Sequence, residues 1–141
     1  MVVKNRVLFV DDEKNVISAI RRAVIEEPYM ASFAGSAQEA LKIMEEREIS
    51  VIVSDLHMPE MDGLTLLKIL KDNHPRTVRV ILSSYVHLPQ MLSAVNQGEI
   101  FKLIAKPWST DKELLPAVRQ AVDHYNLQPA DQPVSPPPAV S

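Results

Sequence analysis

The chain has 141 residues, of which 46% are hydrophobic and 23% are charged, and its formal net charge is −3. This composition predicts one soluble domain with an ordinary core, and the small negative charge disfavours capture by nucleic acid or an anionic membrane. The chain has no cysteine, which excludes disulfides and thiolate zinc sites and fits a reducing cytoplasm. Residues 1–6 carry no signal-peptide core and no apolar run reaches bilayer-spanning length, so we expect a cytoplasmic protein without membrane contact.

Strand-like and helix-like segments alternate along the chain. The expected strands are the apolar runs at 6–10, 31–34, 51–54, 78–82 and about 100–105. Apolar residues at helical spacing follow each run. Two of these helices begin at sequences that match a capping box, Ser36 to Glu39 and Thr110 to Glu113. Pro116 lies inside the last helical pattern, where it should remove a hydrogen bond and kink the helix.

Five strands that alternate with five helices imply right-handed crossovers and an α/β fold, the flavodoxin-like doubly wound (βα)5 parallel sheet with strand order 2-1-3-4-5. Asp62 is a candidate cap for the third helix, and Pro89 is expected in the first turn of the fourth. The domain is expected over residues 1–126. Residues 127–141 are predicted to be a disordered tail or linker, because five of the last thirteen residues are proline.

Charged and hydroxyl residues stand where four of these strands end. Asp11 and Asp12 follow the first strand, Asp55 the third, Ser83 the fourth and Lys106 the fifth. In a doubly wound sheet, ligands bind outside the carboxyl ends of the strands, at the point where the strand order reverses. Here that point lies between strands 1 and 3, so the acids are expected to meet at one edge.

The chemistry of these residues suits a metal ion and a phosphoryl group. Crowded carboxylates repel one another unless a cation neutralises them, and an all-oxygen site favours a hard ion such as Mg²⁺. A carboxylate oxygen can then attack phosphorus and hold it as an acyl phosphate. Lys106 can pair with the phosphoryl oxygens, and Ser83 can donate a hydrogen bond to them. Ser83 is preferred to Ser84 because it directly follows the apolar run.

The chain resembles the receiver domain of two-component response regulators over residues 5 to about 126. The matching motifs are Asp11-Asp12, the stretch Asp55–Gly63, Ser83, and Lys106-Pro107. Any one motif is weak, but all four in this order at the expected spacing are highly specific.

The resemblance implies a role for each of these residues. Asp55 would be the phosphoacceptor for a histidine kinase or a phosphotransfer protein. Asp12, Asp55 and the backbone carbonyl of His57 would ligate Mg²⁺, and Asp11 would assist through water. Ser83 would be the switch hydroxyl, and Lys106 the lysine that contacts the phosphoryl group.

One position departs from the family pattern. Receivers often carry an aromatic switch residue three positions before the lysine, and here that position is Leu103. Strand alternation places the nearest aromatic, Phe101, on the same face as Leu103 but two residues away. The stretches 98–101 and 106–108 look similar to receivers joined to cyclic-dinucleotide or other signalling outputs.

The expected function is a phosphorylation-dependent signalling switch and not an enzyme. The family implies a protein-contact output through helix 4, strand 5 and helix 5, a possible phosphorylation-linked dimer and a possible output domain beyond residue 141. An aspartate-nucleophile phosphatase would need a second acid two residues after the nucleophile, where the chain has His57. A pseudo-receiver that only binds a partner is the other alternative, and the complete set of acid, hydroxyl and lysine disfavours it. Nothing after residue 126 resembles a helix-turn-helix, so direct DNA binding is not expected.

Overall fold

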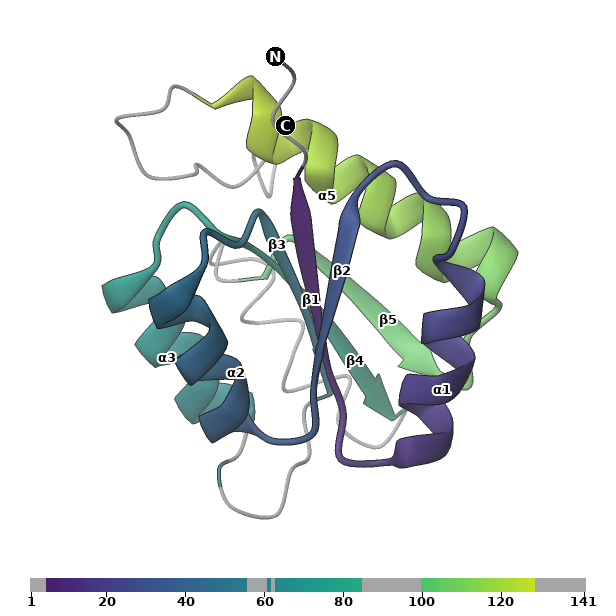
Figure 1. Cartoon of the computed structure of the whole chain (residues 1–141), viewed down its shortest axis with the longest axis horizontal. Helices are drawn as coiled ribbons and strands as arrows, with labels where there is room; N and C mark the ends of the chain where they lie inside the picture. Colours follow the sequence, from purple (N-terminus) through teal and green to yellow (C-terminus); the bar gives the residue numbers. More distant parts are fainter. Residues whose placement is uncertain (1–4, 56–60, 62, 85–99, 129–141) are drawn as a thin grey trace.

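The computed structural model describes residues 5–55, 61, 63–84 and 100–128 (Figure 1). Its elements in chain order are β1 (Arg6–Val10), α1 (Lys14–Ala23), β2 (Met30–Ala34), α2 (Ala37–Glu46), β3 (Val51–Asp55), α3 (Gly63–Asn73), β4 (Val78–Ser84), β5 (Lys102–Lys106), a π-helical turn (Thr110–Leu114) and α5 (Leu115–Leu127). The predicted cap Asp62 and the helix predicted from Pro89 lie outside the described residues. No helix in the described ranges is long and apolar enough to cross a bilayer.

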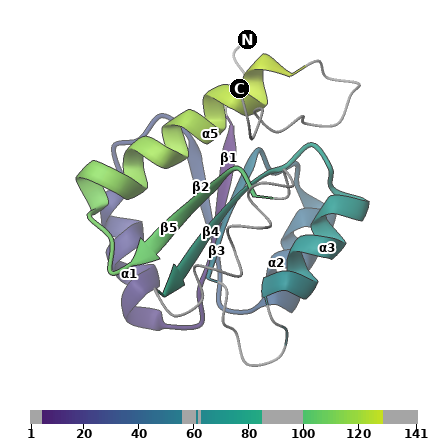
Figure 2. The same cartoon turned by 180° about the vertical axis from the view of Figure 1, so that it is seen from behind.

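The strands form one parallel sheet in the order β2-β1-β3-β4-β5, which confirms the predicted topology. Helices α1 and α5 cover one face of the sheet, and α2 and α3 cover the other (Figures 1 and 2). Strands β1 and β3 are neighbours although α1, β2 and α2 separate them in the chain. The reversal of strand order therefore lies between them, as expected for this fold.

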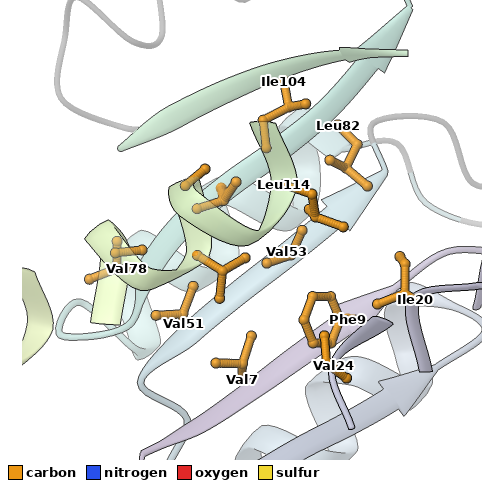
Figure 3. Packing of buried hydrophobic residues seen from close by; sticks show 14 of the residues in the cluster. Val7, Phe9, Ile20, Val24, Val51, Val53, Val78, Leu82, Ile104 and Leu114 are labelled. Atoms are coloured by element: carbon orange, nitrogen blue, oxygen red, sulfur yellow. The ribbon is translucent and has the colours of Figure 1, made fainter. Parts of the chain in front are cut away.

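The core has a layer on each face of the sheet because consecutive strand residues point to opposite sides. On the α1/α5 face, Val7, Phe9 and Val53 pack with residues such as Leu114 of the π-helical turn (Figure 3). On the α2/α3 face, Ile52 belongs to a second buried cluster. Strand β3 is buried along its whole length, which explains why its sequence is apolar at consecutive positions.

Helix α2 begins as the sequence predicts. Ser36 is the N-cap, and its Oγ accepts a hydrogen bond from the Glu39 backbone N–H at 3.1 Å. The Glu39 carboxylate reaches back one residue further than expected, to the N–H of Gly35 at 3.3 Å. The two bonds satisfy amides that a helix start would otherwise leave unpaired.

The second capping box was predicted one residue too late. The cap is Ser109, not Thr110: Ser109 Oγ accepts from the Lys112 N–H at 3.3 Å, and the Ser109 N–H donates to Glu113 Oε1 at 2.7 Å. The π-helical turn adds a residue to the first turn, so the acid lies four positions after its cap. The turn also corrects the expectation for Pro116, which stands in the first turn of α5 rather than its interior.

The expected side of Phe101 was also wrong. Phe101 packs on the α1/α5 face and stacks on His124 of α5, with ring centroids 4.8 Å apart. Leu103 packs on the opposite face, against the cluster that contains Ile81. Phe101 lies in a bend before β5 begins, so the alternation of the strand does not extend back to it.

Candidate functional site

Three carboxylates meet at the carboxyl edge of the sheet. Asp11, Asp12 and Asp55 each offer an oxygen, and these oxygens all lie within 4.8 Å of one another. Asp11 and Asp55 are buried, whereas Asp12 is exposed. The register of β1 on β3 pairs Val10 with Ser54. The residues that follow these two, Asp11 and Asp55, therefore lie side by side at the carboxyl edge of the sheet. The predicted convergence of the acids is confirmed.

Two backbone contacts hold Asp11 where the chain leaves β1. Its N–H donates to the carbonyl oxygen of Ala34 at 3.1 Å, which ties it to the end of β2. Its Oδ1 accepts from the Glu13 N–H at 2.9 Å, where the chain turns into α1. The second oxygen of the carboxylate remains directed to the cluster, because Oδ2 is the atom that meets Lys106.

Lys106 supplies the positive charge of the site. Its Nζ lies 3.2 Å from Asp11 Oδ2 and 3.2 Å from Asp55 Oδ2. The lysine comes from the end of β5, on the far side of β4 from Asp55. Its side chain is 22% exposed, whereas that of Asp11 is 1% exposed. Lys106 pairs with two of the three clustered carboxylates, so the three acids carry more negative charge than this ammonium balances.

Burial and neighbouring charges shift the pKa values of Asp11 and Lys106. Burial raises the pKa of Asp11, the Glu13 N–H opposes the rise, and the charge of Asp55 adds to it. Burial by itself would lower the pKa of Lys106, but the attraction of Asp55 and Asp11 outweighs it and the net pKa is raised. Lys106 is therefore protonated at neutral pH, and the acid cluster favours the arrival of a further cation.

The structure describes the positions of Ser83 and Ser84 but not that of His57. Ser83 is fully buried in β4, one residue beyond the Leu82 that pairs with Asp55. It is therefore at the carboxyl edge, while Ser84 pairs with Lys106 one step further on. The choice between the two hydroxyls remains a prediction. His57 lies outside the described residues.

The sequence did not reveal the relation between Trp108 and Lys106. The Nζ of Lys106 lies 5.9 Å from the centre of the Trp108 ring. A tryptophan two residues after the lysine was the available signal. Trp108 packs against the core cluster on the α1/α5 face, and it also lies beside Lys106.

A doubly wound sheet with acids at the ends of adjacent strands 1 and 3, and a lysine at the end of strand 5, defines a receiver-type α/β domain. The family model of the response regulator receiver domain matches residues 7–119, and the chain belongs to this family.

Known proteins resemble this chain over most of its length. It is 37% identical over 122 residues to the hydrogenase transcriptional regulatory protein HoxA of Cupriavidus necator, covering 86% of this chain and 25% of HoxA. The signal receiver domain of an HD domain-containing protein from Pseudomonas fluorescens Pf-5 matches with a TM-score of 0.82 and 33% identity, over 89% of this chain and 100% of that one. The response regulator TrrA from Thermotoga maritima, in complex with Mg²⁺-BeF, has a TM-score of 0.72 and 25% identity, over 83% and 98% of the two chains. The chain thus spans about a quarter of HoxA.

Proposed function

We propose that this domain is a signalling switch that accepts a phosphoryl group on Asp55 from a histidine kinase or a phosphotransfer protein. The observation that carries the proposal is the position of Asp55. Its carboxylate is clustered with those of Asp11 and Asp12 at the carboxyl edge of the sheet and lies 3.2 Å from the Lys106 ammonium. A nucleophilic carboxylate between a cation-binding cluster and a fixed ammonium suits phosphoryl transfer.

The residues fit a hard divalent cation. Asp11, Asp12 and Asp55 present only oxygen atoms, within 4.8 Å of one another, which is the donor chemistry of Mg²⁺. Asp12, Asp55 and the backbone carbonyl of His57 would hold the ion, with Asp11 assisting through water. When bound, Mg²⁺ supplies positive charge that offsets the carboxylates and the oxygens of the incoming phosphoryl group. The complex of TrrA with Mg²⁺-BeF supports this assignment.

The chain's own residues then divide the reaction among them. An oxygen of Asp55 forms the new bond to phosphorus while the phosphorus–nitrogen bond of the phosphohistidine donor breaks. The electron pair of the broken bond stays on the imidazole nitrogen. Lys106 stands ready to pair with the transferred phosphoryl oxygens, and Ser83 at the same edge donates a hydrogen bond to them. Phosphorylation adds roughly −1.5 to −2 charge at this edge.

The output is a change of protein contact and not catalytic turnover. In this proposal the domain works in the cytoplasm, and phosphorylation acts on a partner surface, on a dimer or on an output domain that follows residue 141. The relatives support more than one output, since HoxA is a transcriptional regulator and the Pseudomonas receiver belongs to an HD domain-containing protein. The phosphatase alternative is disfavoured by His57, which stands where that chemistry needs an acid.

Intact-mass analysis after incubation with a small phosphodonor tests the proposal. The wild-type chain should gain one phosphoryl adduct with Mg²⁺ and none without it, and Asp55→Asn should gain none. Asp123→Asn is the matched control, because it makes the same change at an exposed acid of α5 and should behave as wild type. An adduct that persists in Asp55→Asn would refute the assignment.

A second measurement separates the switch from its alternatives. A receiver should release its phosphate slowly and should not turn over phosphomonoesters, whereas sustained turnover would indicate a phosphatase. A chain that takes up no phosphoryl group from any small donor, yet binds Mg²⁺, would indicate a pseudo-receiver.

A further inference from the structure

The ammonium of Lys106 has a third neighbour besides Asp11 and Asp55. The face of the Trp108 ring lies 5.9 Å from Nζ, measured to the ring centre. This distance is within the range in which a lysine ammonium is attracted by the negative face of an indole. The tryptophan is half-buried and packs against the apolar cluster between the sheet and helices α1 and α5.

The backbone that carries Trp108 is anchored on its C-terminal side. Ser109 caps the π-helical turn through Lys112 N–H, and its own N–H bonds to the Glu113 carboxylate at 2.7 Å. At the end of this turn Leu114 is fully buried in the core. The turn therefore connects the tryptophan to a rigid part of the molecule, and a ring held in this way can restrain a mobile side chain.

Lys106 has a reason to need such a restraint. A lysine side chain has several rotatable bonds and loses considerable entropy when it is held in one position. A cavity of about 370 Å³ opens beside it, lined by Glu13, Val16, Lys106, Pro107 and Trp108. Glu13 is exposed and offers a competing carboxylate in the same cavity. Without the indole, the ammonium would have an alternative to Asp11 and Asp55.

We infer that Trp108 is a positioning residue for Lys106: its ring holds the ammonium against the acid cluster and so sets the rate at which Asp55 takes up a phosphoryl group. The effect on the rate rests on the proposed phosphorylation of Asp55. The effect on the position of the Lys106 ammonium does not. Trp108 itself touches no reacting atom in this scheme.

The kinetic test uses the rate of adduct formation at saturating Mg²⁺ with a small phosphodonor. Trp108→Leu keeps apolar bulk but removes the ring, and should slow the rate about three- to tenfold. Trp108→Phe keeps a ring face and should stay within about twofold of wild type. Leu115→Ala is the packing control, because Leu115 packs on the same cluster but does not line the cavity beside Lys106. Its rate should be unchanged.

A double-mutant cycle separates positioning from general packing. In a Lys106→Met background, Trp108→Leu should cause no further slowing, because the residue that it positions is gone. If Trp108→Leu slows Lys106→Met as much as it slows the wild type, or if Leu115→Ala slows the rate equally, the inference is wrong. Trp108→Met provides the same comparison should the leucine variant fail to fold.

A spectroscopic readout does not depend on phosphorylation. The side-chain carbon–proton signals of Lys106 should show a ring-current shift in the wild type and in Trp108→Phe, and should lose it in Trp108→Leu. Identical Lys106 signals in wild type and Trp108→Leu would overturn the inference. A wild type that takes up no phosphoryl group would instead refute the proposed function, and the two failures are therefore distinguishable.

Discussion

The two ends of the sheet are both polar, but their polar groups are arranged in opposite ways. At the carboxyl edge, Asp11, Asp12 and Asp55 gather three carboxylates, and the Lys106 ammonium contacts two of them, Asp11 and Asp55. At the amino edge, side chains of mostly neutral character exchange hydrogen bonds between the starts of the strands and the end of α5. The first arrangement leaves charge unbalanced, whereas the second pairs its groups.

The amino-edge network joins residues that are far apart in the chain. Asn5 Nδ2 donates to Ser50 Oγ at 3.0 Å and to Asn126 Oδ1 at 2.9 Å, and Asn126 Nδ2 returns a bond to Asn5 Oδ1 at 3.1 Å. Tyr125 Oη donates to Glu48 Oε1 at 2.6 Å. These bonds hold the last turn of α5 against the sheet. Because these groups bond to one another, we interpret the network as structural.

Unbalanced charge, and not the number of polar residues, therefore distinguishes the edge that carries the candidate site. A network in which each group finds a partner lowers the free energy of the fold. A buried cluster of like charges raises it, and persists where a ligand supplies the missing charge. Mutations at the two edges should therefore separate ligand binding from stability.

The largest expected effect is on metal affinity at the carboxyl edge. Asp12→Ala removes a carboxylate from the cluster and should weaken Mg²⁺ binding at least about tenfold. Asn5→Ala, at the amino edge, should leave the affinity unchanged. Titration of the emission of Trp108, the single tryptophan, with Mg²⁺ measures both. Equal Mg²⁺ affinities in Asp12→Ala and wild type would contradict the prediction that the carboxyl edge binds the ion.

The next largest effect is on stability, through the ammonium of Lys106. Lys106→Met removes the ammonium that contacts the buried carboxylates of Asp11 and Asp55 and should lower the free energy of unfolding by about 2 kcal/mol in Mg²⁺-free buffer. This value is below that of fully buried pairs because the lysine side chain is 22% exposed. Urea unfolding measures the loss, with Lys102→Met as the control at an exposed position of the same strand. Saturating Mg²⁺ should reduce the difference, and no loss in Mg²⁺-free buffer would contradict the prediction.

A smaller effect is expected at the amino edge. Asn126→Ala breaks the reciprocal amide pair with Asn5 and should cost about 0.5–1 kcal/mol, since the pair is solvent-exposed. Hydrogen exchange should accelerate in the last turn of α5, while the Mg²⁺ affinity stays the same. Asn15→Ala makes the same change at an exposed position of α1 and controls for helix propensity. Equal exchange in both variants would show that the pair does not hold the helix end.

The smallest effect is a dependence on alkaline pH. Burial raises the pKa of Tyr29, and burial together with the Glu48 hydrogen bond raises that of Tyr125. A raised pKa favours the neutral phenol in the fold, so its contribution is fully present below the unfolded pKa of about 10 and is lost as pH rises above it.

The variant Tyr29→Phe tests this dependence. Among the described residues the Tyr29 hydroxyl is buried without a hydrogen-bond partner, so its removal should leave stability at pH 7 unchanged or raise it by up to about 1 kcal/mol. The variant should also lose less stability than wild type between pH 9 and about 11. Thermal unfolding across this range measures both effects. A steeper alkaline loss in Tyr29→Phe would contradict the assignment.

The sequence alone determined the sheet and the meeting of the acids. Strand length, apolar runs and the alternation with helices are local properties, and they were sufficient to predict the order 2-1-3-4-5. Once strands 1 and 3 are neighbours, residues that directly follow them must share an edge. Asp11, Asp12 and Asp55 could therefore be placed together from their positions in the chain.

Only the tertiary structure decided the features that depend on contacts between distant segments or on a local irregularity. The π-helical turn moved the cap to Ser109, and the bend before β5 put Phe101 on the α5 face, away from Leu103. The Asn5–Asn126 pair joins residues 121 positions apart, and no periodicity reports such a contact. The place of Trp108 beside Lys106 depends on its packing against the buried cluster, because packing and not sequence spacing aims a side chain at its neighbour.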